Sequence, residues 1–210
     1  MKRLVAVSTT LLLGTISISN ALATTYSATT VSYLDYFGSS GTAAVGSFEI
    51  SSPGVITWDV TSGGGTGIFN FEIAGFGSLD GQNNDEDDLT VYVDGVETFS
   101  GTFNLGGGGA DVVYYNPSAA SWTNSNPSGT GLTWAGGTLD VSGLSASLQN
   151  GDNTIQFLYS GANQGLADEG WGLNSASLVA SAPVPEPQVV QLWLASLVLL
   201  GAKGKKCLKI

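Results

Sequence analysis

The sequence predicts an all-β chain, organised as an antiparallel β-sandwich and most simply as a jelly roll. Short segments of alternating apolar and polar residues recur between clusters of Gly, Asn, Asp and Ser, which is the pattern of half-buried strands joined by turns. Residues 24–182 show no sustained helical period, so no crossover helices separate these segments. About eight to ten short strands arranged in this way favour a sandwich of antiparallel sheets.

The strand pattern is clearest in a set of short segments. They are residues 46–50, 55–60, 68–73, 89–93, 96–99, 111–115, 154–159 and 175–179. In the third segment, Phe69, Phe71 and Ile73 alternate with Asn70 and Glu72. Successive side chains of a strand point to opposite faces, so we expect the three apolar side chains in the core and the two polar ones outside it.

Turn signals and glycine runs lie between these segments. Asp94-Gly95 separates two strand segments and predicts a tight hairpin turn of the type that needs positive φ. Two glycine runs, residues 63–65 and 106–109, are expected to be mobile loops. A phosphate-binding role for these runs is disfavoured, because no Lys follows them and no strand-to-helix context is visible.

Charge is distributed unevenly along the 210 residues. All six basic residues lie within residues 2–3 and 203–209, whereas residues 24–182 contain 16 carboxylates and no Lys, Arg or His. Such a domain cannot neutralise phosphates, which argues against nucleic acid, nucleotides and anionic lipid as partners. It also lacks the side chains for histidine acid–base catalysis, Ser-His-Asp triads, lysine Schiff bases and zinc sites built from His or Cys.

Residues 1–23 have the order of a secretory signal peptide. A basic pair at residues 2–3 precedes an apolar stretch over residues 4–18, and a small-residue exit with Ala21 and Ala23 follows. This order predicts export of the chain and cleavage after Ala23. The alternative is a buried N-terminal helix.

Residues 183–210 form a second targeting segment. An apolar run over residues 189–202 is followed by a lysine-rich end. The motif before this run is Val184, Pro185, Glu186 and Pro187. The segment resembles the PEP-CTERM sorting signal of Gram-negative bacteria, although it has lysines where that signal is usually rich in arginine. The resemblance implies that an exosortase-type membrane protease removes the tail and releases the domain to the cell surface or extracellular matrix.

The physical properties of this tail predict a transient association with the inner membrane through a C-terminal hydrophobic helix. The prolines keep the preceding segment extended and prevent the helix from growing back into the domain. The lysines stay on the cytoplasmic side, which places residues 24–182 outside the membrane. About 14 apolar residues span about 21 Å as a helix, against a hydrocarbon core of about 30 Å, so the run is a marginal anchor. The alternative is a tail that stays in the membrane.

The densest acidic segment, residues 80–88, is a candidate calcium site. Its five carboxylates and three side-chain amides offer the hard oxygen ligands that Ca²⁺ prefers. The predicted ligands are Asp80, Asp85, Asp87 and Asp88. The spacing does not match an EF-hand loop, and the alternative is a solvated acidic loop. Asp168 and Glu169 are a second candidate, for which the alternative is a polar turn before a core Trp.

The end of the domain carries a further pattern. Residues 151–159 form a glycine-led alternating segment, and Asp168-Glu169 precedes Gly-Trp within residues 168–175. Together they resemble the closing strands of extracellular jelly-roll modules, including carbohydrate-binding modules. Such modules often place an acidic pair before the Gly-Trp near a structural calcium, so the resemblance implies Ca²⁺ at this position. They often continue with a second acidic position, where this chain has Asn174-Ser175.

Aromatic residues around the Asn-, Ser- and Gly-rich segment 116–131 form a candidate glycan platform. They are Tyr114, Tyr115, Trp122 and Trp134. Trp and Tyr faces suit the CH groups of sugars, and the nearby Asn124 and Asn126 could hydrogen-bond sugar hydroxyls. Trp58 and Trp171 lie on strands or at their starts, so we expect them in the core.

The sequence predicts a non-catalytic protein of the cell surface or exopolysaccharide matrix, with calcium-assisted glycan binding as the candidate activity. One alternative is a structural matrix protein without a specific ligand. Another is a carboxylate-only glycosidase, since glycoside hydrolysis needs only two carboxylates. No pair is singled out among Glu49, Asp59, Glu72 and Glu169, and the usual basic or His partners are missing, so we do not expect an enzyme.

Overall fold

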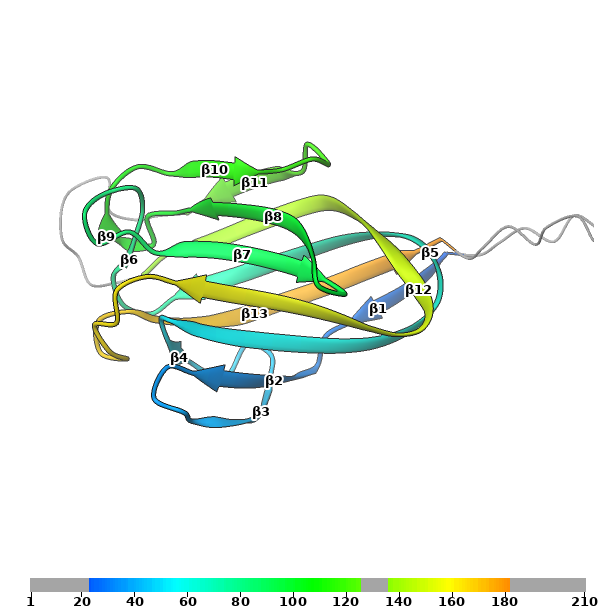
Figure 1. Cartoon of the computed structure of the whole chain (residues 1–210), viewed down its shortest axis with the longest axis horizontal. Helices are drawn as coiled ribbons and strands as arrows, with labels where there is room; N and C mark the ends of the chain where they lie inside the picture. Colours follow the sequence, from blue (N-terminus) through cyan, green and yellow to red (C-terminus); the bar gives the residue numbers. More distant parts are fainter. Residues whose placement is uncertain (1–22, 126–135, 182–210) are drawn as a thin grey trace, which may run out of the picture. The chain divides into compact units, whose positions relative to one another are not determined.

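The computed structural model describes residues 23–125 and 136–181. These residues form thirteen strands and no helix, which confirms the all-β prediction (Figure 1). The strands are β1 (Thr24–Ser27), β2 (Thr30–Asp35), β3 (Ser40–Ala44), β4 (Ile50–Ser51), β5 (Gly54–Gly75), β6 (Leu79–Asp80), β7 (Asp88–Val93), β8 (Val96–Thr102), β9 (Gly106–Gly108), β10 (Val112–Tyr115), β11 (Ser121–Asn124), β12 (Thr138–Ser160) and β13 (Gly170–Ala180).

All of these strands belong to one compact unit, Leu22–Pro183. The predicted signal peptide up to residue 22 and the predicted sorting tail lie outside the described residues. Within the described part of the chain, no helix is long and apolar enough to cross a membrane.

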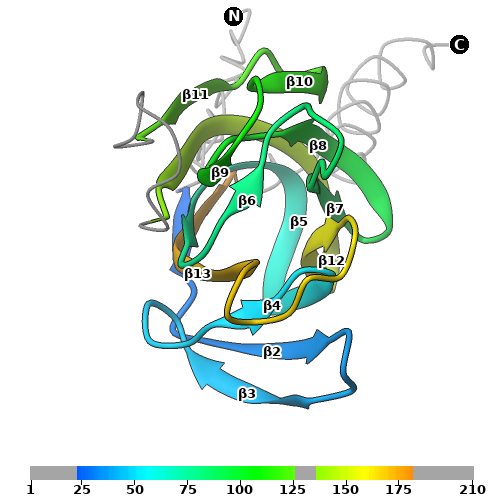
Figure 2. The ribbon, with the colours of Figure 1, turned by 90° about the vertical axis from the view of Figure 1, so that its left-hand side faces the viewer.

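Two long strands, β5 and β12, organise the sandwich. They contain 22 and 23 residues and pair antiparallel from Gly54 opposite Tyr159 to Ala74 opposite Thr138. The first half of β5 and the second half of β12 carry β2 and β3 on one side and β7, β8 and β10 on the other. The remaining halves carry β13 and β1 on one side and β11 on the other. One strand pair therefore belongs to both sheets, with β2 and β3 on the side opposite β10 and β11 (Figure 2).

The glycine run 63–65 is the bend of β5 and not a loop, so this prediction is wrong. Gly64 and Gly65 have φ values of 81° and 97°, a region that residues with a Cβ adopt only at a cost. A Cβ on Gly65 would also lie 2.9 Å from the carbonyl oxygen of Ser181. Glycine therefore allows β5 to pass from one sheet to the other. The run 106–109 is also not a free loop, because it contains β9, which pairs with β6.

Most of the predicted strands are confirmed, but their extent differs. Residues 55–60 and 68–73 are two parts of β5 rather than separate strands. The predicted strand over residues 46–50 is wrong, because only Ile50 of this segment lies in a strand, the short β4 (Ile50–Ser51). The hairpin β2–β3 was not predicted. Its residues are mostly small or hydroxylic and Val31 is its only fully buried one, so the apolar alternation is weak.

The core lies between the two sheets and contains the apolar faces that the alternation predicted. Phe71 from β5 contacts Phe157 of β12 edge-on, with ring centroids 5.0 Å apart, and Phe99 of β8 at 6.3 Å. These partners belong to the opposite sheet, so the ring of Phe71 joins the two layers. Trp58 and Trp171 are buried, as expected.

The hairpin between β7 and β8 confirms the turn prediction. Asp94 and Gly95 have φ values of 51° and 77°, as a two-residue turn with two left-handed positions requires. The carboxylate of Asp94 also accepts a hydrogen bond of 2.8 Å from the backbone N–H of Thr154, which ties the turn to β12.

Truncation of Phe71, whose ring joins the two sheets, should destabilise the domain strongly. We expect Phe71→Ala to lower the free energy of unfolding by about 3–5 kcal/mol, because it removes a buried ring and leaves a cavity. Val96→Ala is the control, because Val96 is 66% exposed and should change stability by about 0.5 kcal/mol or less. Urea unfolding of both variants measures the difference, and equal losses would contradict the role given to Phe71.

Candidate functional site

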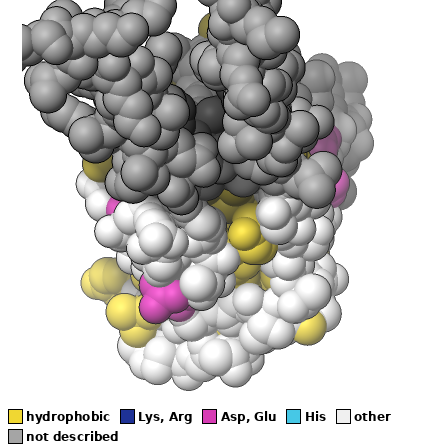
Figure 3. Space-filling model, turned by 90° about the vertical axis from the view of Figure 1, so that its right-hand side faces the viewer, with side chains coloured by type: hydrophobic (Ala, Val, Ile, Leu, Met, Phe, Trp, Pro, Cys, Tyr) yellow, Lys and Arg dark blue, Asp and Glu magenta, His cyan; other side chains and the backbone are white. Residues whose placement is uncertain are grey.

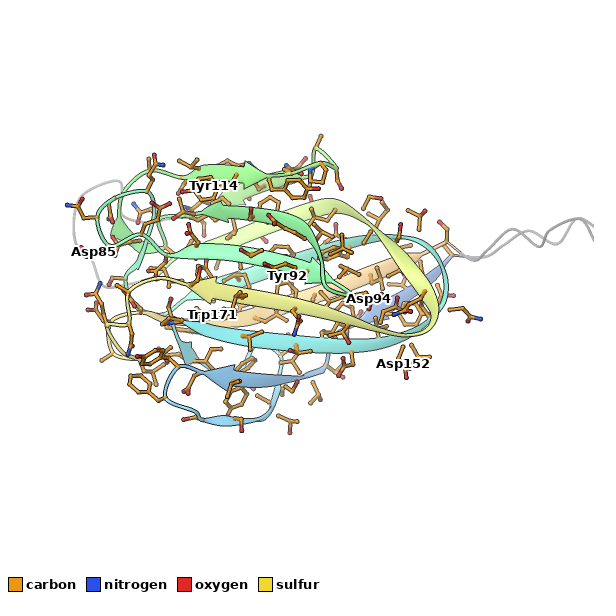
Figure 4. All side chains as sticks on the ribbon, viewed as in Figure 1. Asp85, Tyr92, Asp94, Tyr114, Asp152 and Trp171 are labelled. Atoms are coloured by element: carbon orange, nitrogen blue, oxygen red, sulfur yellow. The ribbon has the colours of Figure 1, made fainter. Side chains whose placement is uncertain are left out.

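Carboxylates from both predicted calcium segments meet at one end of the sandwich. This end is formed by β4, the β6–β9 pair, the start of β7 and the segment 161–169 that leads into β13. In Figure 4 it is the end that carries Asp85, and the opposite end carries Asp94 and Asp152. We call this region the acidic end. Its clustered carboxylates are those of Asp80, Asp87, Asp168 and Glu169.

Ser52 joins the two acidic segments. Its hydroxyl donates to Asp87 Oδ1 at 2.8 Å, and its backbone N–H donates to the carbonyl of Glu169 at 2.7 Å. The other oxygen of Asp87 accepts the backbone N–H of Asp80 at 3.0 Å. Asp87 and Glu169 are both fully buried. Two candidates that are separate in the sequence therefore form one buried polar cluster.

Several buried polar atoms at this end have no hydrogen-bond partner among the described residues. One oxygen of Glu169 accepts a backbone hydrogen bond, but Oε1 has no partner. The same is true of Ser51 Oγ, Tyr159 Oη and Trp171 Nε1. Buried unpaired polar groups are costly, so such a group indicates a missing partner such as water or an ion. Ser51 and Tyr159 carried no signal in the sequence, since a lone Ser and a strand Tyr are ordinary core residues.

Burial raises the pKa values of both buried carboxyls. The pKa of Asp87 is raised to about 6, mainly by desolvation and further by the charges of Asp80 and Asp88, although two hydrogen bonds oppose the shift. The pKa of Glu169 is raised to about 7, mainly by desolvation and further by the charge of Asp87. The described residues include no Lys, Arg or His that could offset these charges, and the opposite end of the domain also shows acidic and no basic side chains (Figure 3).

Asp80 and Asp168 lie at the rim of this cluster. Asn83 Nδ2 donates to Asp80 Oδ1, and the Ser78 hydroxyl donates to Asp168 Oδ1, both at 2.6 Å. Burial raises the pKa of Asp80, and the charges of Asp85 and Asp168 add to the effect. A Cβ on Gly107 would lie 2.6 Å from Asp80 Oδ2, so glycine is needed where β9 passes this carboxylate.

The other two predicted ligands, Asp85 and Asp88, do not join the cluster. Asp85 is exposed. Asp88 begins β7, is less buried than Asp87 and lies beside Glu86. Burial and the nearby charge of Glu86 raise the pKa of Asp88. The acidic segment therefore does not form one ligand loop.

Tyr114 connects the acidic segment to the candidate glycan platform. It lies at the irregularity of β10 between Val113 and Tyr115, and its hydroxyl donates to Glu86 Oε1. This hydrogen bond raises the pKa of Tyr114 to about 12. Tyr114 and Tyr115 are 48% and 43% exposed. Tyr114 of β10 is thus in direct contact with the acidic segment.

Trp122 of β11 is the third aromatic residue of the predicted platform. It is 36% exposed, and its ring packs edge-on against the buried Phe103 with a centroid distance of 5.3 Å. Asn124 Nδ2 donates to the carbonyl of Asn104 and to Asp111 Oδ1, so this amide nitrogen is used within the protein. Trp134 and Asn126 lie outside the described residues.

The acidic end has the oxygen chemistry of a calcium site but not a complete ligand set in its present arrangement. In residues 23–125 and 136–181, no group of three or more Asp, Glu, His or Cys side chains is arranged to hold a metal ion. The unpaired Glu169 Oε1 and the adjacent Asp87 fit a hard cation in charge and chemistry. Hydroxyl, carbonyl and water oxygens would have to supply the remaining ligands, as is usual for Ca²⁺.

No protein-family model matches the chain, and no curated protein matches it. The solved structures to which it is similar include the module CBM35 of Abf62 from Cellvibrio japonicus, with 12% identity, 62% of this chain and 68% of that chain covered, and a TM-score of 0.35. The CBM51 of a GH95 protein from Clostridium perfringens, in complex with methyl-galactose, has 12% identity, 77% and 91% coverage and a TM-score of 0.32. The Agl-KA catalytic domain has 18% identity, 83% and 30% coverage and a TM-score of 0.34. At these TM-scores we draw no conclusion about ligand or activity.

The buried carboxyls should make stability depend on pH. We expect the free energy of unfolding in EDTA to fall as the pH rises from about 4 to about 7, because Asp and Glu of the unfolded chain titrate near pH 4. Asp87 and Glu169 keep their protons in the folded state up to pKa values of about 6 and about 7. Between these limits the folded state binds more protons, so raising the pH favours unfolding. Urea unfolding across this range measures the slope.

Two variants test whether the pH dependence of the free energy of unfolding comes from the acidic end. Glu169→Gln cannot ionise and should flatten the profile between about pH 5 and 7. Asp152→Asn at the opposite end should keep the wild-type profile, because Asp152 is exposed and an amide oxygen can still accept the hydrogen bond of Thr61. The same slope in Glu169→Gln as in the wild type would exclude Glu169 as its source.

Proposed function

We propose that the chain is an exported, non-catalytic protein of the cell surface or exopolysaccharide matrix that binds extracellular polysaccharide, with Ca²⁺ at the acidic end. The observation that carries the proposal is the exposure of Tyr114, Tyr115 and Trp122, which range from 36% to 48% exposed on β10 and β11. These two strands lie on the same side of the sandwich in Figures 1 and 2. We call this surface the aromatic edge.

The chemistry of the aromatic edge favours a neutral sugar polymer. Flat Trp and Tyr rings present apolar faces to sugar CH groups and polar edges to hydroxyls. An anionic polymer is a poor partner, because the described residues carry no cation and many carboxylates.

Calcium would support the aromatic edge through the acidic segment. Asp87, Glu169 and Ser51 would supply side-chain oxygens at the acidic end, and a divalent cation would offset repulsion that no basic residue relieves. Tyr114 is hydrogen-bonded to Glu86, which lies next to Asp87 in the chain. A cation that orders this segment would therefore also fix one ring of the aromatic edge.

Export and surface sorting complete the proposal. The signal-peptide pattern of residues 1–23 and the Pro-Glu-Pro tail of residues 183–210 support transfer across the inner membrane and processing by an exosortase-type protease. The location after tail removal would be the cell surface or extracellular matrix of a Gram-negative bacterium.

Removal of the platform tryptophan should weaken polysaccharide binding. We expect Trp122→Ala to reduce affinity by about tenfold or more, about 1.4 kcal/mol, because aromatic anchors carry much of the binding energy of such surfaces. Phe37→Ala is the control, since Phe37 is 61% exposed on the hairpin between β2 and β3, away from this edge. Affinity electrophoresis in neutral polysaccharide gels, with millimolar Ca²⁺, measures both variants.

Equal retardation of Trp122→Ala and wild type would place binding elsewhere on the chain. If the wild type is not retarded by any of the gels, with or without Ca²⁺, the structural matrix protein without a ligand is the better description.

Calcium should stabilise the folded chain. We expect millimolar Ca²⁺ to raise the Tm by about 5 °C or more relative to EDTA, because a ligand of the native state at 100 times its Kd contributes about 2.7 kcal/mol. Mg²⁺ should not reproduce the rise, since it demands a smaller octahedral site. Glu169→Gln and Asp87→Asn should lose the effect, and Asp85→Asn should keep it. An unchanged wild-type Tm would make the acidic end a metal-free buried cluster.

A further inference from the structure

A second candidate binding surface lies on the outer face of β13, β5 and β12, where β12 pairs with β11. A cleft of about 540 Å³ is recessed into this face, and residues 27–29 and Val45 border it beyond β13. The volume is in the range of small-molecule sites. We call it the outer cleft.

The register of the three strands aligns polar side chains in two rows on this face. Asp140, Ser175, Asn70 and Ser177 line the outer cleft, and Glu72 lies between Asp140 and Ser175 in the first row. Ser175 of β13 lies opposite Glu72 of β5, and Glu72 lies opposite Asp140 of β12. In the next row, Ser177 lies opposite Asn70. The apolar residues that alternate with these positions face the core, so the rows are the outward side of the same strands.

Two irregularities of the sheet frame these rows on either side of β5. In β13, Asn174 is an extra residue between the pairs Leu173–Ile73 and Ser175–Glu72. In β12, Ser142 and Gly143 together lie opposite Asn70, between the pairs formed by Val141 and Leu144. β-Bulges re-aim side chains and are frequent beside functional sites.

The bulges bring their polar groups to the side chains of β5. Asn174 Nδ2 donates to Glu72 Oε1 at 2.8 Å, and the backbone N–H of Gly143 donates to Asn70 Oδ1 at 2.9 Å. Asn70 Nδ2 donates in turn to Ser177 Oγ at 3.4 Å. The floor of the outer cleft is therefore held in place before any ligand binds.

Glu72 and Asp140 give this floor an unusual charge arrangement. Like charges directly opposite each other on neighbouring strands destabilise a sheet. Burial, and then the nearby Glu72, raise the pKa of Asp140. The described residues offer no basic side chain to relieve the repulsion. Hydrogen-bond donors from a ligand would relieve it.

We propose that the outer cleft binds a short segment of a neutral saccharide, whose hydroxyl groups donate to the carboxylate of Asp140, which lines the cleft opposite Glu72. Ionised carboxylates only accept hydrogen bonds, so their ligand must supply donors. The amide groups of Asn70 and Asn174 and the hydroxyls of Ser175 and Ser177 can donate or accept, which matches the two roles of a sugar hydroxyl. This inference rests on the proposed function for its ligand class, but it concerns a different surface.

Other ligand classes fit the outer cleft less well. A phosphate or carboxylate ligand would meet Asp140, with Glu72 beside it, and no cation. A divalent cation would find only two carboxylates here, and no described group of three acidic side chains is arranged to hold one. The Asn174 side chain also directs its N–H donor toward Glu72, whereas a cation ligand would have to be an oxygen.

Steric closure of the outer cleft tests the proposal. Ser175→Trp fills an exposed position of the cleft, and Ser147→Trp is the matched control at an exposed position of β12 that does not line it. Binding of neutral hexasaccharides of glucose, xylose, mannose and galactose to the full chain is measured by titration calorimetry in EDTA and in Ca²⁺. We expect Ser175→Trp to weaken binding at least tenfold and Ser147→Trp to leave it unchanged.

A charge variant keeps the test valid if Ser175→Trp fails to fold. Asp140→Asn removes one of the two facing carboxylates without changing their size. We expect it to weaken saccharide binding while the free energy of unfolding stays the same or rises, since the like-charge repulsion is removed. If the role of Asp140 were merely structural, Asp140→Asn would not weaken saccharide binding while leaving the free energy of unfolding unchanged or raised.

The outcomes distinguish this inference from the proposed function. Wild-type affinity in both Ser175→Trp and Asp140→Asn, together with loss of binding in Trp122→Ala, would overturn the outer cleft and leave the aromatic edge intact. Absence of binding of all four hexasaccharides by the wild type would overturn both. Calcium-dependent heat without any saccharide that disappears in Asp140→Asn would identify a cation site and overturn the saccharide assignment.

Discussion

The antiparallel pairing of β5 with β12 is the constraint on which the rest of the structure depends. It runs from Gly54 opposite Tyr159 to Ala74 opposite Thr138, so the same two strands serve both sheets. Bending them at Gly64 and Gly65 brings Phe71 of one half against Phe157 of the other. Every other strand of the two sheets adds to one of these halves, directly or through a neighbour. The position of each candidate site follows from this bent pair.

The acidic end is costly for the fold to maintain. Burying Asp87 and Glu169 without a cation raises their pKa values, and several neighbouring polar atoms stay unpaired. A small sandwich has a net stability of only several kcal/mol, so such a cluster is a substantial burden. A bound cation would neutralise the buried carboxylates and so stabilise the folded state. This is the physical argument for treating the cluster as a site rather than as ordinary core.

Local patterns predicted those features that depend only on neighbours in the chain. Alternation in residues 68–73 identified which side chains are buried, and Asp94-Gly95 identified a turn, because both follow from backbone geometry within a few residues. The glycine run 63–65 was misread as a loop, since glycine permits a bend as readily as a loop. The hairpin β2–β3 was missed because it buries too little apolar surface to produce a pattern.

The sequence by itself determined the fold class, the absence of cationic side chains from residues 24–182 and the identity of the acidic and aromatic segments. Only the tertiary structure decided that Asp87 meets Glu169 through Ser52, whereas Asp88 lies beside Glu86. It also decided that Glu72 faces Asp140 across β5 and β12. The physical reason is that the alternation of side chains between the two faces of a strand depends only on local backbone geometry. The partner across the sheet, by contrast, depends on a register set by the whole length of the paired strands and by the bend between their halves.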